Sequence, residues 1–243
     1  MKTDLPLVAD LHTHTLASGH AYSTVQEMIL TAREKGLEVL ALTEHGPAMP
    51  GSCHLYYFGN MRVIPRQWNG VFVLRGVEAN IIDYQGNVDL KPRYLKKLDI
   101  VWAGLHAPCL EPGTVEENTA ALTGALCNPF VCGITHPGNP KFPVDEEKIA
   151  EVAAREGKML EINNSSFLVR EGSFDRCLQI AHFCRRYKTI VCVNSDAHIA
   201  RDVGNFQQAW QIVQQAQIPE DQVLNTSMEK VLSFFNIIDD WIN

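Results

Sequence analysis

Residues 7–14 read Leu-Val-Ala-Asp-Leu-His-Thr-His, a short apolar run that ends in two histidines separated by one residue. The run 7–11 is almost continuously apolar, which is typical of a strand buried on both faces, as in a parallel sheet. In extended backbone, His12 and His14 point to the same side. The stretch therefore predicts a buried strand that delivers two imidazoles together at its carboxyl end.

The same kind of apolar run recurs along the rest of the chain, separated by amphipathic segments. The predicted strands, the first included, span residues 7–11, 38–43, 71–77, 99–103, 131–135, 158–162 and 189–193. The predicted helices span residues 23–35, 114–127, 144–156, 173–187, 205–217 and 227–241. Strands that alternate with helices indicate an α/β protein with a parallel sheet.

Capping residues support two of these helices. Ser23 or Thr24 begins the first, and Gly36 ends it. Thr114 is followed three residues later by Glu117, which is the pattern of a capping box.

Metal-binding or acid-base side chains follow six of the seven predicted strands within a few residues. They are His12, His14, His45, Glu78, His106, His136, Asp196 and His198. The carboxyl ends of parallel strands in a barrel meet on one face, where active sites form. An open doubly wound sheet also fits the alternation, but it would spread these groups along a line. We therefore expect a TIM-like (β/α)7 barrel with its site at the C-terminal face.

These residues, with His20, form a candidate metal-ligand set of seven imidazoles, two carboxylates and no thiolate. That mixture suits zinc, manganese or iron rather than calcium or magnesium alone. If Glu78 bridges two ions, the nine ligands form about ten bonds, enough for three ions with about three protein ligands each. We expect three divalent transition-metal ions, zinc first, and we expect Asp10 to orient one imidazole. His54 and His182 fall outside the pattern.

A phosphate ester is the substrate that gains most from such a cluster, which activates water and clamps charged oxygens. Arginine suits phosphate because its guanidinium binds two oxygens at once. The candidate phosphate-binding cations are Arg62, Arg66, Arg75 and Lys141. The sixth strand ends in amides and hydroxyls at the same face, and these candidate substrate-binding residues are Asn163, Asn164 and Ser165.

Composition excludes several classes of protein. The 243 residues are 46% hydrophobic, which predicts one folded domain over residues 1–243. A net charge of −7 argues against general nucleic-acid binding. No apolar run approaches the roughly 18 residues of a membrane span, and the N-terminus does not resemble a secretory signal. Seven cysteines without a CxxC pair predict reduced thiols, and hence a cytoplasmic protein.

Several motifs resemble the PHP family, the polymerase and histidinol phosphatase metal hydrolases. They are Asp10-Leu11-His12-Thr13-His14-Thr15, Leu42-Thr43-Glu44-His45-Gly46, Gly76-Val77-Glu78, Gly104-Leu105-His106, Thr135-His136-Pro137 and Ser195-Asp196-Ala197-His198. Further stretches are similar to its small stand-alone bacterial phosphatase branch, the YcdX type. These are residues 17–24, Asn60-Met61-Arg62, His136-Pro137-Gly138-Asn139-Pro140-Lys141 and residues 161–167.

The resemblance implies a distorted seven-stranded barrel and a defined partition of the metals. His12, His14, Glu78 and Asp196 would hold the first ion. His20, His45 and His198 would hold the second, and Glu78, His106 and His136 the third. One departure is visible: Glu44 stands where the family usually has aspartate, which leaves the local hydrogen bonding open.

The implied activity is that of a phosphatase acting on a small phosphomonoester through a metal-bound hydroxide, with Glu78, Asp196 and His198 in the metal cluster. A histidinol phosphatase, or a phosphodiesterase similar to a 3′-exonuclease, is an alternative within the family. A non-enzymatic metal-binding domain is an alternative from another class. The oligomeric state stays open, a homo-oligomer included.

Overall fold

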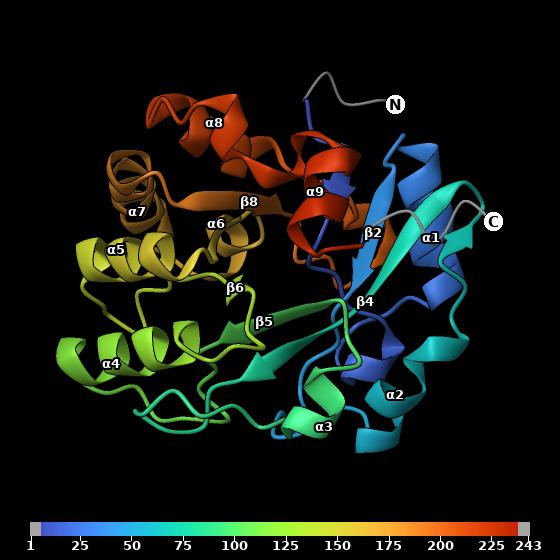
Figure 1. The fold of residues 1–243 in the computed structure, drawn as a ribbon, viewed down its shortest axis with the longest axis horizontal. Coiled ribbons are helices and arrows are strands. Elements are labelled where there is room, and N and C mark those ends of the chain that lie inside the picture. Colours follow the sequence, from blue (N-terminus) through green and yellow to red (C-terminus); the bar gives the residue numbers. More distant parts are fainter. Residues whose placement is uncertain (1–5, 238–243) are drawn as a thin grey trace.

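Parallel strands form the centre of the computed structural model, which describes residues 6–237 (Figure 1). They are β1 (Ala9–Asp10), β2 (Val39–Leu42), β4 (Val71–Asn80), β5 (Ile100–Gly104), β6 (Gly133–Ile134), β7 (Met159–Asn163) and β8 (Ile190–Asn194). They pair in this order, each parallel to the next. All seven predicted strands are confirmed. The short β3 (Gln67–Trp68), which pairs antiparallel with β4, was not predicted.

The sheet is nearly closed between β1 and β8. A parallel bridge joins Thr13 to Ala197, just beyond the two strands. Below it, the Asn225 side chain fills the seam: its amide donates to the Ala9 carbonyl at 2.8 Å, and its Oδ1 accepts from the Val193 N–H at 3.1 Å. The fold is therefore a TIM-like barrel, distorted at this seam, as predicted.

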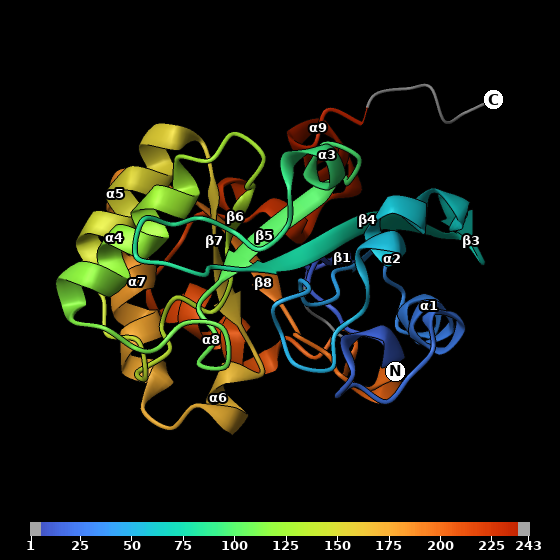
Figure 2. The same ribbon diagram turned by 90° about the horizontal axis from the view of Figure 1, so that it is seen from below.

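Helices cover the outside of the barrel (Figures 1 and 2). The longer ones are α1 (Val25–Glu34), α4 (Val115–Leu126), α5 (Glu146–Glu156), α7 (Ser173–Tyr187), α8 (Gln207–Gln215) and α9 (Met228–Phe234). Each corresponds to a predicted helix. The loops add α2 (Leu55–Asn60), α3 (Pro92–Leu95), α6 (Ser166–Val169) and the short 3-10 helices η1 (Leu16–Ser18), η2 (Met61–Val63), η3 (Ala200–Asp202), η4 (Glu220–Gln222) and η5 (Leu224–Thr226), none of which was predicted.

The predicted capping box of α4 is present, and α1, for which only the capping residue was predicted, has one as well. Thr24 caps α1 together with Glu27, and Thr114 caps α4 together with Glu117. The last helix is shorter than predicted: α9 ends at Phe234, and Asn236 has a left-handed backbone with φ 53°. The end of the predicted range, residues 238–241, lies outside the described residues.

Two apolar layers hold the barrel together. Inward-facing side chains such as Leu11, Phe72 and Trp102 fill its interior, and Val231 of α9 packs against them. A larger layer lies between the strands and the surrounding helices. The interior is packed with apolar side chains, so the polar residues at the strand ends form a separate layer above it.

Candidate metal centre

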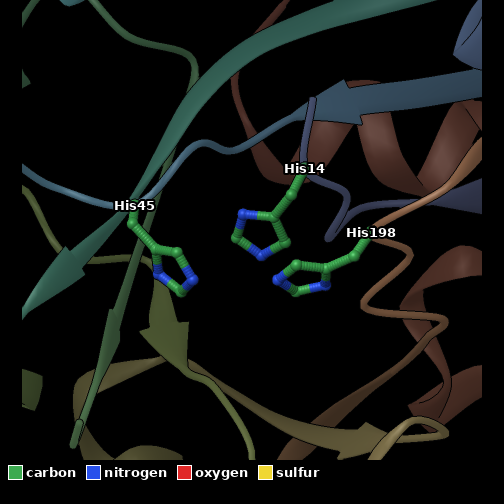
Figure 3. A group of neighbouring side chains, drawn as sticks. All are labelled: His14, His45 and His198. Carbon is green, nitrogen blue, oxygen red and sulfur yellow. The ribbon is translucent and has the colours of Figure 1, made fainter. Parts of the chain in front are cut away.

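The predicted ligands converge at the carboxyl ends of the strands. The imidazole centroids of His14 and His45 lie 4.4 Å apart, and those of His14 and His198 lie 4.3 Å apart. Figure 3 shows these three rings pointing toward one another from separate segments. His106 extends the cluster on one side, 4.9 Å from His45 and 5.1 Å from His136.

The carboxylate of Glu78 lies at the middle of this cluster and is fully buried. Its Oε1 lies 2.9 Å from His136 Nε2 and 3.3 Å from His106 Nε2. Its Oε2 lies 2.8 Å from His45 Nδ1 and 3.3 Å from His12 Nε2. The two oxygens of one carboxylate thus face two different sets of imidazoles, which is the geometry of a bridging ligand.

Hydrogen bonds fix which nitrogen of His12 and His14 carries the proton. His12 Nδ1 lies 2.7 Å from a Glu161 oxygen, which can only accept from it. Ser18 donates its hydroxyl proton to Glu44 and therefore accepts from His14 Nδ1 at 3.0 Å. When His12 is neutral, both Nε2 atoms present lone pairs, although they lie only 3.0 Å apart. Two facing lone pairs repel each other unless a cation lies close to both.

The same arrangement recurs at the outer edge of the centre. His20 Nδ1 donates to the Ser18 carbonyl at 3.1 Å, and His198 Nδ1 donates to the Asp196 carbonyl at 3.0 Å. Their Nε2 atoms, which are left with lone pairs, lie 3.2 Å apart. This pair is more exposed than His12 and His14.

Several buried polar atoms in the centre have no hydrogen-bond partner among the described residues. They are His45 Nδ1, Glu78 Oε2 and both ring nitrogens of His106. Buried polar atoms are nearly always paired, so an unpaired group at the meeting point of so many donors fits metal ligation. Imidazole nitrogens with carboxylate oxygens suit divalent transition metals.

Three groups of side chains have ligand atoms within 4.8 Å of one another: His12 with His14 and Asp196; His14 with His45 and His198; and His45 with Glu78 and His106. The first group matches the first ion of the implied partition. The second group contains His14 where the implied second ion has His20. The third group contains His45 where the implied third ion has His136. Because the groups share His14 and His45, the ligands form one continuous centre rather than three separate sites.

The protonation states suit cation binding. Burial raises the pKa of Glu78 and Asp196, but neighbouring histidines, His12 first, outweigh it and hold both pKa values well below the ordinary range. Burial lowers the pKa of His14 well below its usual value. Burial, and then the charge of Arg170, lowers the pKa of His136 to about 4. The centre therefore offers ionised carboxylates at Glu78 and Asp196 and neutral imidazoles at His14 and His136 at neutral pH. Burial lowers the pKa of His12, but the charges of Glu161 and Glu78 outweigh it and raise that pKa well above its usual value.

Two of the predicted ligands have strained backbones. His136 has φ 32° and Asp196 has φ 55°, in the left-handed region that side chains other than glycine seldom adopt. The Asp196 N–H donates to the His12 carbonyl at 3.0 Å, and the His136 N–H donates to Glu161 at 2.7 Å. These bonds hold both conformations and aim the two side chains into the centre. Strain of this kind clusters at functional sites.

Glu161 is the residue that orients the ligands, a role for which the sequence suggested Asp10. The Glu161 carboxylate accepts from His12 Nδ1 and from the Asn194 amide through Oε1, and from the His136 N–H and the Asn163 amide through Oε2. The expectation for Asp10 is wrong. Its carboxylate accepts from the Ser195 N–H and hydroxyl and from the Gly204 N–H, and no imidazole contacts it by a hydrogen bond within the described chain.

Glu44, which departs from the family pattern, organises the loop that carries the first histidines. Its Oε2 accepts from the Thr15 N–H at 2.9 Å and the Ser18 hydroxyl at 2.6 Å. Its Oε1 accepts from the Thr15 hydroxyl at 2.5 Å and the Tyr57 hydroxyl at 3.1 Å. Through Ser18, this carboxylate fixes the proton on His14. The longer side chain is thus fully hydrogen-bonded and keeps the ligand loop in place.

A pocket of about 350 Å³ opens beside the centre. His20, His45, Asp196 and His198 line it, together with Asn164 and Ser165, two of the residues predicted to bind substrate. Arg170 also lines it, a residue that the sequence analysis missed because it lies in a loop seven positions beyond β7. The guanidinium donates to the Ser166 hydroxyl at 3.0 Å and lies 3.7 Å from an Asp196 oxygen.

The other predicted substrate-binding residues have different surroundings. The Asn163 amide donates to Glu161 and Asp196, so it positions a ligand. Arg62 and Lys141 are exposed and do not line the pocket. Arg66 pairs with Asp99, which precedes β5, and Arg75 donates to the Ile64 carbonyl at 3.1 Å. The structure therefore places Arg66 at the amino ends of the strands, on the opposite side from the centre.

The two remaining histidines and the cysteines agree with the sequence analysis. His54 caps α2 by accepting from the Tyr56 N–H, and His182 is exposed on α7. All seven cysteines lie within the described residues and are free thiols. No helix among residues 6–237 is long and apolar enough to cross a membrane.

The fold and the centre define an α/β barrel with a candidate metal site at the carboxyl ends of its strands. The PHP domain model matches residues 10–218. The chain belongs to the PHP family, as its motifs predicted.

Curated relatives and solved structures extend this assignment. A probable phosphatase of Caldanaerobacter subterraneus subsp. tengcongensis is 52% identical over 95% of this chain and 91% of its own length. One from Acetivibrio thermocellus is 49% identical over 93% and 94%. The histidinol phosphate phosphatase of Lactococcus lactis subsp. lactis, solved with zinc, L-histidinol and phosphate, has a TM-score of 0.62 at 17% identity, over 87% of this chain and 94% of that one. This last likeness concerns the fold alone.

Proposed function

We propose that residues 1–243 form a single phosphoesterase domain that hydrolyses a small phosphomonoester with the help of three divalent metal ions, zinc first. The observation that carries the proposal is the Glu78 carboxylate, whose two oxygens face separate sets of imidazoles. The relatives named probable phosphatases support the reaction class. The zinc and phosphate of the Lactococcus lactis structure are consistent with it.

Each ion has a proposed set of ligands. His12, His14, Glu78 and Asp196 hold the first ion, His20, His45 and His198 hold the second, and Glu78, His106 and His136 hold the third. When bound, such ions supply positive charge that acidifies water and neutralises phosphate oxygens. Manganese or iron would suit the same donors.

The protein supplies its own phosphate-binding group in Arg170. Its guanidinium lines the pocket beside Asp196 and is held by Ser166, so it is aimed before a substrate arrives. A planar guanidinium binds two phosphate oxygens at once, and a positioned donor loses little entropy on binding. Asn164 and Ser165 line the same wall. Asn164 Oδ1 already accepts from the Gln208 and Ala209 N–H groups, so its role is to hold that wall.

The test combines metal analysis with a substrate screen. Purified protein, reconstituted with zinc, manganese or iron, is expected to bind close to three ions per chain and to release phosphate from at least one phosphorylated metabolite. Saturation at one ion, with no weaker sites, would contradict the trinuclear centre. Full loading without turnover of any phosphate ester would instead favour a metal-binding domain without catalysis. Activity on single-stranded DNA but not on monoesters would favour an exonuclease.

Steady-state kinetics on variants test which positively charged side chains bind the substrate phosphate. Arg170→Ala is expected to raise KM for the monoester by about 10-fold or more, and Arg170→Lys to rescue it poorly, because an ammonium does not reproduce the planar fork. Arg176 is a matched control: it pairs with Glu146 on the outer helices, so Arg176→Ala should behave as wild type. None of the four predicted cations lines the pocket, and Arg62→Ala and Lys141→Ala test the two that are exposed.

A further inference from the structure

A second and larger pocket lies outside the metal centre, where α2, η2 and α3 meet the start of α1. Its volume is about 1040 Å³, compared with about 350 Å³ for the pocket beside the metal centre, and the two share no lining residue. Its walls carry Tyr56, Tyr57, Tyr94, Arg93, Lys96 and Lys97. We call it the tyrosine groove. Helices α2 and α3 pack together beside it (Figure 1).

The tyrosine groove is positively charged on an otherwise acidic protein. Three cations line it, and none of the described lining residues is acidic, although acidic residues outnumber basic ones 28 to 21 in the chain. Neither Lys96 nor Lys97 forms an ion pair within residues 6–237, and both are exposed. Their charge is therefore not neutralised by the protein, and an anion would be attracted to it.

The same groove exposes aromatic and apolar surface. The Tyr56 side chain is 76% exposed and that of Val63 is 66% exposed. The Arg93 guanidinium lies 5.0 Å from the centre of the Tyr94 ring, so the ring is held beside a cation. An exposed tyrosine ring in a groove that also carries cations favours stacking of an aromatic ligand with a negative group.

We propose that the tyrosine groove is a second binding site, which takes an aromatic phosphate of the size of a nucleoside monophosphate. The ring stacks on Tyr56, and the phosphate lies between Arg93, Lys96 and Lys97. Charge complementarity selects an anion, and a volume of about 1040 Å³ accommodates a small molecule. The site is independent of the metal centre and of the reaction proposed there.

Isothermal titration calorimetry on the metal-loaded protein tests the proposal. The probe is the phosphonate analogue of AMP, whose P–C bond resists hydrolysis at the metal centre. The double variant Lys96→Ala, Lys97→Ala and the single variant Tyr56→Ala are each expected to weaken binding at least tenfold. Lys91→Ala and Tyr22→Ala are matched controls, because Lys91 is exposed in the same segment and Tyr22 is 75% exposed, yet neither lines the groove. Both should bind as wild type.

Further titrations and controls identify which groups of the ligand are recognised and where the ligand binds. Adenosine and ribose 5-phosphate should each bind at least tenfold more weakly than the phosphonate, because each lacks one of the two groups. Affinity that is unchanged in the groove variants but lost in Arg170→Ala would place the probe in the metal centre and overturn the proposal. A dimer in sedimentation experiments that Tyr56→Ala dissociates would overturn it as well, because a second copy would then cover the groove.

Discussion

His12 and Glu161, which are 149 positions apart in the chain, share a hydrogen bond of 2.7 Å between Nδ1 and Oε1, and both side chains are buried. The bond places the proton of His12 on Nδ1 and turns Nε2 toward His14. The same carboxylate holds the backbone of His136 through its other oxygen. One residue that is not a proposed ligand thus positions two proposed ligands.

The Glu161→Gln variant tests that role. Each Glu161 oxygen accepts from two donors, so the amide of glutamine would direct its NH₂ at two other donors and leave them unpaired. Metal affinity is expected to fall by about 10- to 100-fold, as for other groups that orient metal ligands. Competition with a chromophoric chelator measures it. Glu147→Gln, on α5 where the carboxylate pairs with Arg186 rather than with any ligand, is the control, and equal affinity in both variants would contradict the role.

Gly104 keeps the centre open at the end of β5. A Cβ at this position would lie 2.9 Å from His106 Cε1, 3.0 Å from Glu78 Oε1 and closer still to the Thr135 hydroxyl. Gly104→Ala is therefore expected to reduce metal content and activity although no ligand is removed. Gly59→Ala, where a Cβ would meet only the Tyr94 ring at ordinary contact distance, is the matched control. Normal metal content in Gly104→Ala would show that the centre can shift to accept the methyl group.

Glu78→Gln is expected to be more damaging than loss of any single histidine. It removes negative charge between two sets of imidazoles and so weakens two ions together. Elemental analysis should find about two fewer ions in this variant and about one fewer in His106→Ala, by the ligand partition proposed above. Near-normal metal content and rate in Glu78→Gln would exclude a bridge.

Cysteine reactivity should depend on pH in a defined direction. Burial raises the pKa of the Cys53 and Cys109 thiols from 9.0 to about 11. A raised pKa lowers the thiolate fraction, to about one in a thousand at pH 8, and only the thiolate reacts. Alkylation with iodoacetamide should therefore label the exposed Cys127 first, while labelling of Cys53 should rise about tenfold per pH unit up to pH 11. Mass spectrometry of peptides would detect the opposite order.

The Asn225→Ala variant tests the seam of the barrel. The side chain is fully buried and bonds the backbones of Ala9 and Val193. Removing it leaves those peptide groups unpaired, which is expected to cost about 3 kcal/mol of the free energy of unfolding. Urea unfolding measures the cost as a lower midpoint with an unchanged slope. Asn60→Ala, at an exposed position, should leave the midpoint in place.

Most of the fold could be predicted from patterns within short stretches of sequence. Strand β5 is a continuous apolar run, so it is expected to be buried whichever strands pair with it. The two residues of the capping box of α4 lie within four positions of sequence. The short β3 escaped although its signal is local: it pairs with β4 across the two-residue turn Asn69-Gly70, a sequence typical of a β-hairpin.

The candidate site was predictable where the ligands follow strands, since parallel strands bring their carboxyl ends to one face. Residues that act through other residues were harder to predict. Glu161 reaches His12 only across the barrel, although a carboxylate inside a buried strand was a signal of its importance. Arg66 was misleading because its loop begins near the centre but ends beside Asp99, at the amino end of β5.

The seam between β1 and β8 also bears on the kinetics of folding. β1 pairs with β2 about 30 positions away, but its contacts with the residues after β8 span 185 positions, as in the bond from the Ser195 N–H to Asp10. Closing a loop of this length costs conformational entropy, and this cost is offset only once the contact has formed. We therefore expect β1 to gain its contacts with the residues after β8 late in folding, so that His12 and His14 meet Asp196 after β1 has paired with β2.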